Sequence, residues 1–217
     1  MKPRRSGFWF GADRRRQGGR MARTQAENYD EIRQGILRRS ATVFAGQGYA
    51  NTSIADLARA NGISRGLLYH YFASKEALLS EMLHEHLDMM LAAVRRAAAG
   101  EGGAEMRFRD TVRTFVRINA ASKDLQVTLL HDLQNLAEDD RAAIEAKQRD
   151  ILAVVRDLIA ACDPAAGRDR RTLSARTMML VGMINYTYIW YDPSGPVGPE
   201  EYADMAADTW LKGRGAG

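Results

Sequence analysis

The stretch TSIADLARANGISRGLLYHYFASK, residues 52–75, contains two short helical patterns separated by a glycine turn. In the first pattern, Ser53 can accept hydrogen bonds from the free N–H groups of a helix start, and Asp56 follows three residues later, as in a capping box. Gly62 tolerates the left-handed conformation that commonly ends a helix. Ser64 then provides a cap for a second helix. The stretch therefore predicts two helices joined by a tight turn, which is the helix-turn-helix arrangement.

Each predicted helix has one apolar face, and the second helix also carries a polar arc. Ile54 and Leu57 share one side of the first helix, while Leu68 and Phe72 share one side of the second. The remaining arc of the second helix holds an arginine, a glycine, tyrosines and a histidine. Core packing does not need these residues, but a helix in the major groove of DNA does. The spacing alone also fits a helical hairpin in any all-α protein.

The residue types on the polar arc indicate individual contacts with DNA. Arg65 lies at the start of the second helix, where its guanidinium fork can pair with O6 and N7 of guanine. Tyr71 and Lys75 are better suited to hold phosphates, together with the N–H groups of a helix that begins at Ser74. We therefore expect base reading at the start of the second helix and phosphate contacts at its end.

The run Gly62–Leu79, GISRGLLYHYFASKEALL, closely resembles the DNA-binding domain of TetR-type transcriptional regulators, in which a glycine turn leads into a recognition helix ending in Tyr-x-Tyr-Phe and then Ser-Lys-Glu. The strong resemblance extends over about residues 29–79. It implies DNA contacts at the following residues: Thr52, Ser53, Ser64, Arg65, Gly66, Tyr69, His70, Tyr71 and Lys75. Leu67 departs from the smaller residue often found at its position, which suggests an apolar contact such as one with a thymine methyl group.

The length of 217 residues allows a small DNA-binding domain and a larger body. The helical patterns predict an all-α fold of about nine helices. We expect a leader over residues 1–20, a helix-turn-helix domain over 21–75, and a ligand-binding and dimerisation domain over 76–217.

No apolar run approaches the roughly 20 residues that span a membrane, no secretion signal opens the chain, and the single Cys162 excludes an internal disulfide. These features predict a cytoplasmic protein.

Positive charge is concentrated in the predicted DNA-binding part. Residues 21–75 carry seven basic and four acidic side chains, whereas residues 76–217 carry 17 basic and 22 acidic ones. Residues 1–20 add seven basic side chains and one acidic one. A basic head on an acidic body suits sequence-specific DNA binding and argues against a protein that coats DNA nonspecifically.

Residues 1–20 are rich in arginine and glycine and show neither a helical nor a strand period, so we expect them to be disordered. One interpretation is a basic arm that reaches into the minor groove of DNA. We favour another, in which translation of the native protein begins at Met21. Residues 17–19, Gln-Gly-Gly, can be encoded by a purine-rich ribosome-binding sequence at a suitable distance upstream.

The remaining helices follow from apolar periodicity between glycine and proline breaks. A supporting helix precedes the helix-turn-helix, over about residues 25–47, and a long helix over about 74–99 links head to body. Within the long helix, His84 and His86 point in different directions, which excludes a shared metal ion and indicates a partly exposed surface. The helices expected in the body cover residues 104–121, 123–136, 138–162, 169–191 and 199–212.

Two sets of residues are candidates for binding a small molecule. The first lies in the apolar segment 125–136, where three polar side chains face either a ligand cavity or the surface: His131, Gln134 and Asn135. The second comes from residues 183–213, MINYTYIWYDPSGPVGPEEYADMAADTWLKG, which resemble the C-terminal helices of TetR-type regulators that respond to acyl-CoA thioesters. This resemblance implies a pocket lined by Asn185, Tyr188 and Trp190, with a basic mouth for the phosphates at Arg170, Arg171 and Arg176. A drug-like molecule or a free acid is the alternative effector.

The last two predicted helices concentrate methionine and aromatic residues, more apolar surface than one face of a monomer needs. We therefore expect them to pack against their copies as a four-helix bundle in a homodimer. The alternative is that they complete a monomeric core, but a protein that reads palindromic half-sites generally needs two heads. The predicted interface residues are Met178, Met179, Gly182, Met183, Tyr186, Met205 and Trp210.

The sequence contains no glycine-rich phosphate loop, nucleophile elbow, HExxH or CxxC pattern. It therefore predicts no catalytic residue, no cofactor and no metal site. The leading hypothesis is a dimeric repressor that binds double-stranded operator DNA and is released by a small-molecule inducer. An all-α enzyme and a nonspecific DNA-binding protein are the remaining alternatives.

Overall fold

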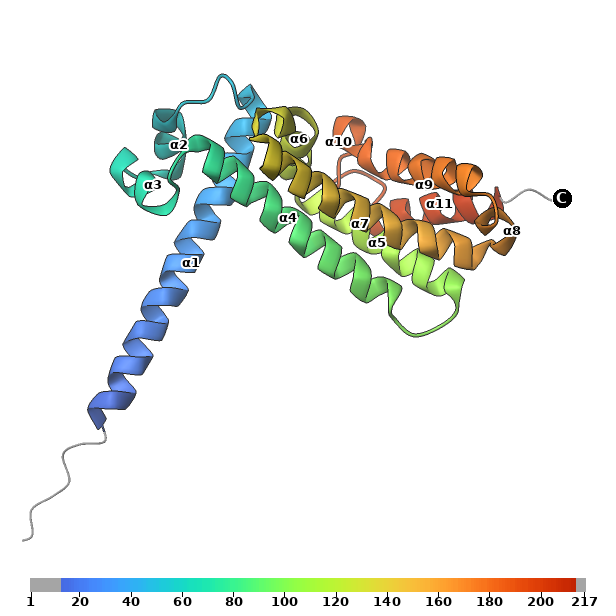
Figure 1. Cartoon of the computed structure of the whole chain (residues 1–217), viewed down its shortest axis with the longest axis horizontal. Helices are drawn as coiled ribbons and strands as arrows, with labels where there is room; N and C mark the ends of the chain where they lie inside the picture. The colour runs from blue at the N-terminus through green and yellow to red at the C-terminus, as the bar shows by residue number, and fades with distance from the viewer. Residues whose placement is uncertain (1–12, 214–217) are drawn as a thin grey trace, which may run out of the picture.

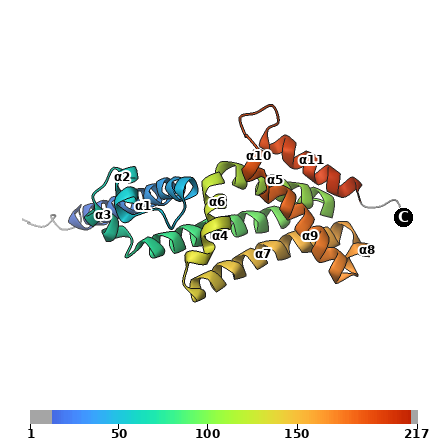
Figure 2. The ribbon, with the colours of Figure 1, turned by 90° about the horizontal axis from the view of Figure 1, so that it is seen from above.

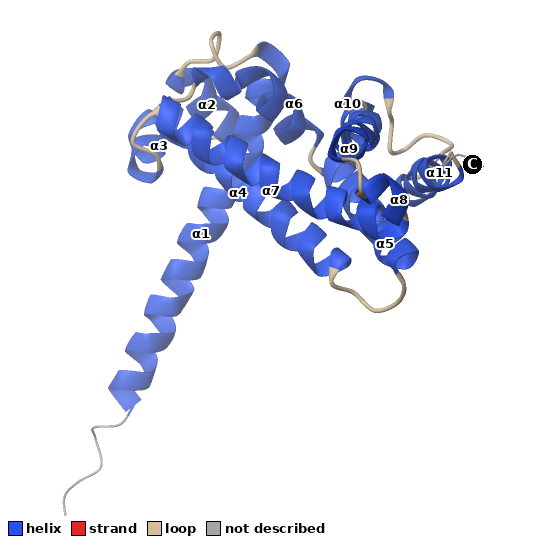
Figure 3. Ribbon diagram, turned by 45° about the vertical axis from the view of Figure 1, so that its right-hand side comes forward, coloured by secondary structure: helices blue, strands red, loops and turns tan. Residues whose placement is uncertain are grey.

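A computed structural model describes the backbone of residues 13–213 and the side chains of residues 27–213 other than Ala166. Over these residues the chain forms helices and no strand (Figure 3). Nine of the helices have seven or more residues, which confirms the predicted all-α fold, and none of the described helices is long and apolar enough to cross a bilayer. The helices are α1 (Asp13–Gln47), α2 (Ile54–Asn61), α3 (Arg65–Tyr71), α4 (Lys75–Ala98), α5 (Ala104–Ala121), α6 (Lys123–Asp132), the 3-10 helix η1 (Leu133–Asn135), α7 (Glu138–Cys162), α8 (Pro164–Gly167), α9 (Arg170–Asn185), α10 (Thr187–Trp190) and α11 (Pro199–Lys212).

The helices form a small head, α1 to α3, and a longer body, α4 to α11 (Figures 1 and 2). α4 starts beside α3 and runs along the body, where it packs against α5 and α7. The N-terminal part of α1 extends away from the rest of the chain (Figure 1). The prediction of disorder is therefore wrong for residues 13–20, because extending an existing helix adds one backbone hydrogen bond for each residue that it fixes. Residues 1–12 lie outside the described residues.

The local capping signals act as the sequence predicts. The Ser53 side chain accepts a hydrogen bond from the N–H of Asp56, and the Asp56 carboxylate accepts one from the N–H of Ser53, which completes a capping box on α2. Gly62 ends α2 with φ 67°, the left-handed conformation that glycine adopts without steric cost. The hydroxyl groups of Ser64 and Ser74 cap α3 and α4 in the same way as Ser53. These caps fix the sharp turn between α2 and α3.

The apolar faces of the three head helices meet in one core. Phe44 from α1, Leu57 from α2, and Leu68 and Phe72 from α3 and its C-cap are all at most 2% exposed. Burial of each such side chain contributes about 1.5–3 kcal/mol. Because Leu68 and Phe72 anchor one side of α3 as predicted, the opposite side of that helix must face outward.

The body differs from the predicted helices at three places. The helix expected over residues 123–136 ends at Asp132 as α6 and is followed by the 3-10 helix η1. The helix expected over residues 169–191 is divided at Tyr186 into α9 and α10, where the Thr187 hydroxyl donates to the carbonyl of Ile184 at 2.7 Å. A side chain that satisfies a backbone carbonyl in this way competes with the regular helical hydrogen bond. Residues 164–167, expected as a break, form the four-residue α8, in which a proline occupies the tolerated first position.

α11 lies along α5 and is held there by arginine–carboxylate pairs. The pairs are Arg109 with Asp208 at 2.6 Å, Arg113 with Asp204 at 2.7 Å and Arg117 with Glu200 at 3.4 Å. The members are spaced four residues apart on both helices, so they form two facing stripes that set an antiparallel register. All six side chains are accessible to water, which screens the attraction within each pair. The pairs therefore specify alignment more than stability.

Candidate DNA-binding and effector sites

α3 presents its polar arc to solvent. The exposed residues of this arc and of the preceding cap are Ser64, Arg65, Gly66, Leu67, Tyr69 and His70. Leu67 is 41% exposed and Tyr69 is 53% exposed, although both are large side chains. The arc combines a guanidinium fork, hydroxyl groups and an apolar group, which are the groups that read base edges and phosphates in a DNA groove. The structure thus brings the central predicted DNA-binding residues together on one surface.

Tyr71 lies half-buried between α3 and α1. The centroid of its ring is 4.6 Å from that of Tyr29 on α1, and the His70 ring meets Tyr29 edge-on at 6.1 Å. Within the described residues the Tyr71 hydroxyl makes no hydrogen bond, so it remains available for the predicted phosphate contact. The aromatic cluster lets α1 support the C-terminal end of α3.

Lys75 has a role inside the head that the sequence analysis missed. Its Nζ donates hydrogen bonds to the backbone carbonyls of Tyr49 and Thr52, both at 2.8 Å, and lies 3.9 Å from the centroid of the Tyr49 ring. These contacts tie the start of α4 to the turn between α1 and α2. A lysine ammonium has three donors, so one donor remains for the predicted phosphate contact.

The side chain of Thr52, a predicted DNA contact, is turned into the head. Thr52 is 2% exposed, its hydroxyl donates to the carbonyl of Gly48 at 2.8 Å, and it accepts from Nε2 of Gln47 at 3.1 Å. Thr52 therefore closes the turn after α1 instead of facing outward. Ser53, the actual N-cap of α2, is exposed and stays a predicted DNA contact.

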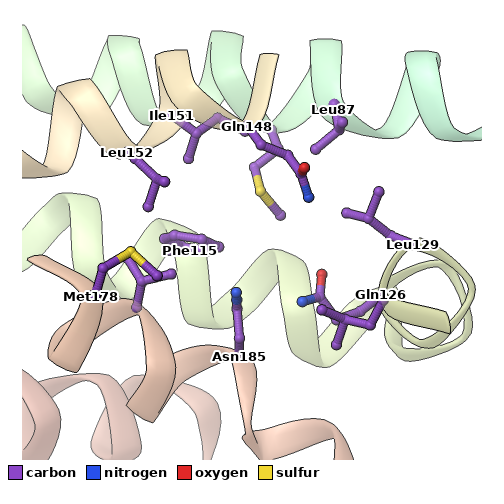
Figure 4. A pocket seen from close by; sticks show the side chains of 12 residues that line it. Leu87, Phe115, Gln126, Leu129, Gln148, Ile151, Leu152, Met178 and Asn185 are labelled. Carbon is purple, nitrogen blue, oxygen red and sulfur yellow. The ribbon is translucent and has the colours of Figure 1, made fainter. Parts of the chain in front are cut away.

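A cavity of about 210 Å³ lies in the body among α4, α5, α6, α7 and α9 (Figure 4). Its apolar lining consists of Leu87, Met90, Phe115, Leu129, Leu130, Ile151, Leu152, Met178 and Val181. Three carboxamides complete it, Gln126 from α6, Gln148 from α7 and Asn185 from α9, and their side-chain ends point into the cavity (Figure 4). None of the lining side chains among the described residues is charged. A mostly apolar lining with a few convergent polar groups is typical of a small-molecule site.

Asn185 is the one predicted ligand-binding residue that lines this cavity. Five others, on α6, η1 and α10, do not line it: His131, Gln134, Asn135, Tyr188 and Trp190. His131 and Tyr188 meet outside the cavity, with Tyr188 Oη 3.4 Å from His131 Nε2. The amides of Gln134 and Asn135 donate to backbone carbonyls near the end of α6, and Trp190 is 57% exposed. These residues lie beyond the inward-facing part of α6 or after the break in α9.

The predicted basic mouth also lies away from the cavity. Arg176 pairs with Asp163 at 2.7 Å, and its guanidinium carbon is 4.7 Å from the ring centroid of Trp210. Arg170 and Arg171 are exposed at the start of α9, and neither lines the cavity. The resemblance of the C-terminal helices did not specify which face of α9 turns inward.

The positions of the cavity glutamines follow a spacing pattern that is visible in the sequence. Gln126 precedes two cavity-lining leucines by three and four residues, and Gln148 precedes Ile151 and Leu152 by the same spacing. Residues at this spacing share one helix face. A glutamine on an otherwise apolar, inward-facing stripe is a signal that sequence alone could have provided.

Two comparisons with protein families cover both parts of the chain. Residues 36–82 match bacterial regulatory proteins of the tetR family, and residues 101–214 match the tetracyclin repressor-like C-terminal domain. The chain belongs to the TetR family. Membership makes it a ligand-responsive transcriptional regulator and not an enzyme, in agreement with the leading hypothesis from the sequence.

Individual TetR-family relatives resemble the chain over most of its length. A TetR-family transcriptional regulator from Bordetella parapertussis superposes with a TM-score of 0.81 at 42% identity, over 84% of this chain and 95% of that one. The HTH-type transcriptional regulator HbdR of Aromatoleum sp. is 25% identical over 167 residues, which are 77% of this chain and 72% of HbdR. AibR, crystallised with isovaleryl coenzyme A and operator DNA, has the same fold, with a TM-score of 0.71 at 22% identity over 82% of this chain and 97% of AibR.

This TetR-family protomer leaves an apolar face uncovered on its last helices. The exposed residues are Met178, Met179, Met183, Tyr186, Ile189, Trp190 and Met205, each between 37% and 67% exposed. Gly182 lies among them, and a Cβ at this position would meet no atom within 4 Å. Trp210, predicted at the same interface, is 8% exposed, and its ring centroid lies 4.9 Å from that of Phe108. Trp210 therefore packs mainly into the core of this chain, and its place at an interface stays a prediction.

α6 connects the cavity to the head. Gln126 on this helix lines the cavity, while Asp132 at its end accepts a hydrogen bond from the backbone N–H of Tyr49 at 3.2 Å. Asp124, near the start of α6, accepts one from the hydroxyl of Thr42 on α1 at 2.6 Å. One helix thus contacts the cavity and two points of the DNA-binding head.

α4 provides a second connection between the two parts. Leu87 and Met90 of α4 line the cavity, and the preceding turns of the same helix carry Glu81 and Glu85, which both form ion pairs with Arg33 of α1. The start of α4 is tied to the head through Lys75 as described above. α4 therefore contacts both the cavity and the head.

Proposed function

We propose that this TetR-family protein is a homodimeric repressor, which binds a palindromic operator in the cytoplasm and is released when a small molecule fills the body. The observation that carries the proposal is the outward arc of α3, with Arg65 exposed while Leu68 and Phe72 anchor the helix. The second helix of a helix-turn-helix enters the major groove with its N-terminal residues at base edges. The exposed methionine face of α9 to α11 supports the dimer, which supplies a second head for the second half-site.

On the operator, Arg65 pairs with O6 and N7 of a guanine, and Leu67 contacts a thymine methyl group. Tyr71 and the third donor of Lys75 bind phosphates, which fix the register of the head on the duplex. The further contacts come from Ser53, Ser64, Gly66, Tyr69 and His70. Their exposure supports these roles.

The substitution Arg65→Ala is expected to weaken operator binding about 5- to 150-fold, because loss of a bidentate contact with a base costs about 1–3 kcal/mol. Thermal stability should not change, since Arg65 is exposed. Fluorescence anisotropy with the operator and with a scrambled duplex measures both affinities. Arg38→Ala, which removes an exposed cation of α1 close to Lys123, is the matched control and should keep wild-type affinity. An equal loss of affinity for both duplexes in Arg65→Ala would contradict base reading by Arg65.

The proposed effector is an acyl-CoA thioester. The resemblance of residues 183–213 to the C-terminal helices of acyl-CoA-responsive regulators supports this choice, as does the fold shared with AibR, which was crystallised with isovaleryl coenzyme A. The cavity also lacks a charged side chain that would offset burial of a free carboxylate. A cavity of about 210 Å³ is too small for a whole CoA ester, so the acyl end enters it and the nucleotide stays outside.

Release of DNA requires that the effector prefers one arrangement of the two heads. α6 and α4 both line the cavity and both contact the head through Asp132, Asp124 and the Arg33 ion pairs. An effector that repositions these helices therefore changes the spacing of the two recognition helices. A preference of about 3 kcal/mol for the DNA-incompetent spacing lowers operator affinity roughly 150-fold.

A titration of the protein–operator complex tests this effector class. Short and medium acyl-CoA esters are expected to release the operator, whereas coenzyme A alone, the corresponding free acids and drug-like cations are not. The shift in operator affinity, measured by anisotropy at fixed ionic strength, should reach about 5- to 150-fold for the preferred ester. Release by free acids or cations without any response to CoA esters would refute the acyl-CoA assignment and favour the other effector class.

A further inference from the structure

Gln126 places an amide without a partner at the cavity wall. Its side chain is only 4% exposed, and it makes no hydrogen bond within the described residues, although its polar end points into the cavity (Figure 4). An amide that faces a mostly apolar cavity is a hydrogen-bonding group that a ligand with a matching polar atom can use. A ligand that hydrogen-bonds to Gln126 would restore this partner.

Asn185 is oriented toward the same space. Asn119, which is 5% exposed on α5, donates from Nδ2 to Oδ1 of Asn185 at 3.2 Å. Since the Asn185 oxygen is engaged by this bond, the N–H groups of its amide remain, and Figure 4 shows the Asn185 nitrogen directed into the cavity. The cavity therefore holds a positioned donor for an oxygen atom of a ligand, across from the amide of Gln148 (Figure 4).

The charge of the cavity wall limits which ligands can enter. All lining side chains among the described residues are apolar or carboxamides. Lys147, the neighbour of Gln148 in sequence, forms an ion pair with Asp88 at 2.7 Å instead of facing the cavity. A buried carboxylate or ammonium group without a counter-ion is strongly disfavoured, whereas an uncharged oxygen acceptor matches the amide donors.

We propose that the cavity selects an uncharged ligand end of roughly eight to ten non-hydrogen atoms with one carbonyl oxygen, to which the amides of Gln126 and Asn185 donate. The size follows from the cavity volume, since a cavity of about 150 Å³ accepts benzene. This inference rests on the proposed function, in which that end is the acyl group and the oxygen is the thioester carbonyl. The amides then distinguish an ester from the free acid by charge and from a plain hydrocarbon by the hydrogen bond.

Calorimetry on the free protein with three aromatic probes of similar size tests the selection. Acetophenone carries a neutral carbonyl, benzoate carries a carboxylate, and ethylbenzene has no oxygen. Acetophenone is expected to bind most tightly, with ethylbenzene about tenfold weaker because it leaves the amides unpaired, and with benzoate weaker still. Binding of benzoate as tight as that of acetophenone, or no binding of any probe, would overturn the proposal.

Two variants assign the preference to the amide. Gln126→Leu is expected to fold, since it replaces a buried polar group by an apolar one of similar size, and to prefer acetophenone over ethylbenzene clearly less than the wild type does, because only the Asn185 donor remains. Gln134→Leu is the matched control on the adjoining η1, because Gln134 is exposed and bonds to a backbone carbonyl outside the cavity. Thermal unfolding of both variants confirms folding. If the Gln126→Leu protein still binds acetophenone about tenfold more tightly than ethylbenzene, then Gln126 does not contribute to the selection.

The probe experiment can fail separately from the proposed function. It uses no DNA and no coenzyme A, so a wrong order of probe affinities leaves release of the operator by acyl-CoA untouched. The converse outcome is that the probes bind in the expected order while no CoA ester changes operator binding. That result would support the cavity chemistry and reject regulation by an acyl-CoA.

Discussion

Met183→Arg is expected to separate the proposed dimer into folded monomers and to weaken operator binding by about 100-fold or more. Met183 is 37% exposed in the middle of the uncovered face of α9, next to Gly182 and Tyr186. An arginine there would have to be buried without a partner when two such faces pack together. Each head alone then binds one half-site, and loss of the linked second contact removes the 10²- to 10⁴-fold gain that two joined binding modules provide.

Analytical ultracentrifugation measures the oligomeric state, and anisotropy with a full operator and with a half-site duplex measures DNA binding. Met89→Arg is the control, because Met89 is 45% exposed on α4 and lies outside the α9 to α11 face. The control should remain dimeric and keep full operator affinity. A Met183→Arg protein that stays dimeric would show that the two copies associate through another surface, and one with lower half-site affinity would point to damage in the head.

The head was predictable from sequence because its features are local. The capping box of Ser53 and Asp56, the left-handed Gly62 and the caps at Ser64 and Ser74 each involve residues within a few positions of each other. Propensity and hydrogen-bonding chemistry act over this range, so the predicted limits of α2 and α3 agree with the structure, whereas α1 begins about 12 residues earlier than predicted. The outward arc of α3 follows once Leu68 and Phe72 are assigned to the core.

The effector site was not predictable in the same way because it is assembled from distant segments. The cavity combines Leu87 of α4 with Gln126, Gln148 and Asn185, and no local pattern states which faces of these helices meet. The same reason explains Lys75, whose partners in the turn near Tyr49 are 26 residues away in sequence. The polar residues near the end of α6 were predicted as ligand contacts from composition, whereas the glutamines that line the cavity lie on otherwise apolar helix faces.

His86 departs from the partly exposed surface expected for residues 84–86. Its side chain is 3% exposed, and neither ring nitrogen has a hydrogen-bond partner within the described residues. Burial lowers the pKa of His86 to about 4 from its usual 6.5, because a charged imidazolium would lose its hydration without gaining a partner. The folded protein therefore holds this histidine in its neutral form.

Acidification from pH 6.5 to pH 4 is consequently expected to destabilise the fold by about 3 kcal/mol through His86 alone, since each unit of pKa shift corresponds to about 1.4 kcal/mol. Between these pH values the unfolded chain binds a proton at His86 and the folded chain does not, so the free energy of unfolding falls as the pH falls. Above pH 6.5 both states are neutral at this position, and His86 contributes no pH dependence.

Urea denaturation at pH 7.5 and at pH 4.5, at one protein concentration because dimers are stabilised by association, measures this difference. The His86→Leu protein should lose less stability than the wild type between the two pH values. The loss that remains comes from the other acid-sensitive groups, which both proteins share. His84→Gln, which replaces a partly exposed histidine two residues earlier on α4, is the matched control for substitution of a histidine on this helix. If His86→Leu loses as much stability as the wild type between the two pH values, then His86 is protonated in the folded protein, and α4 must admit water or a partner at that position.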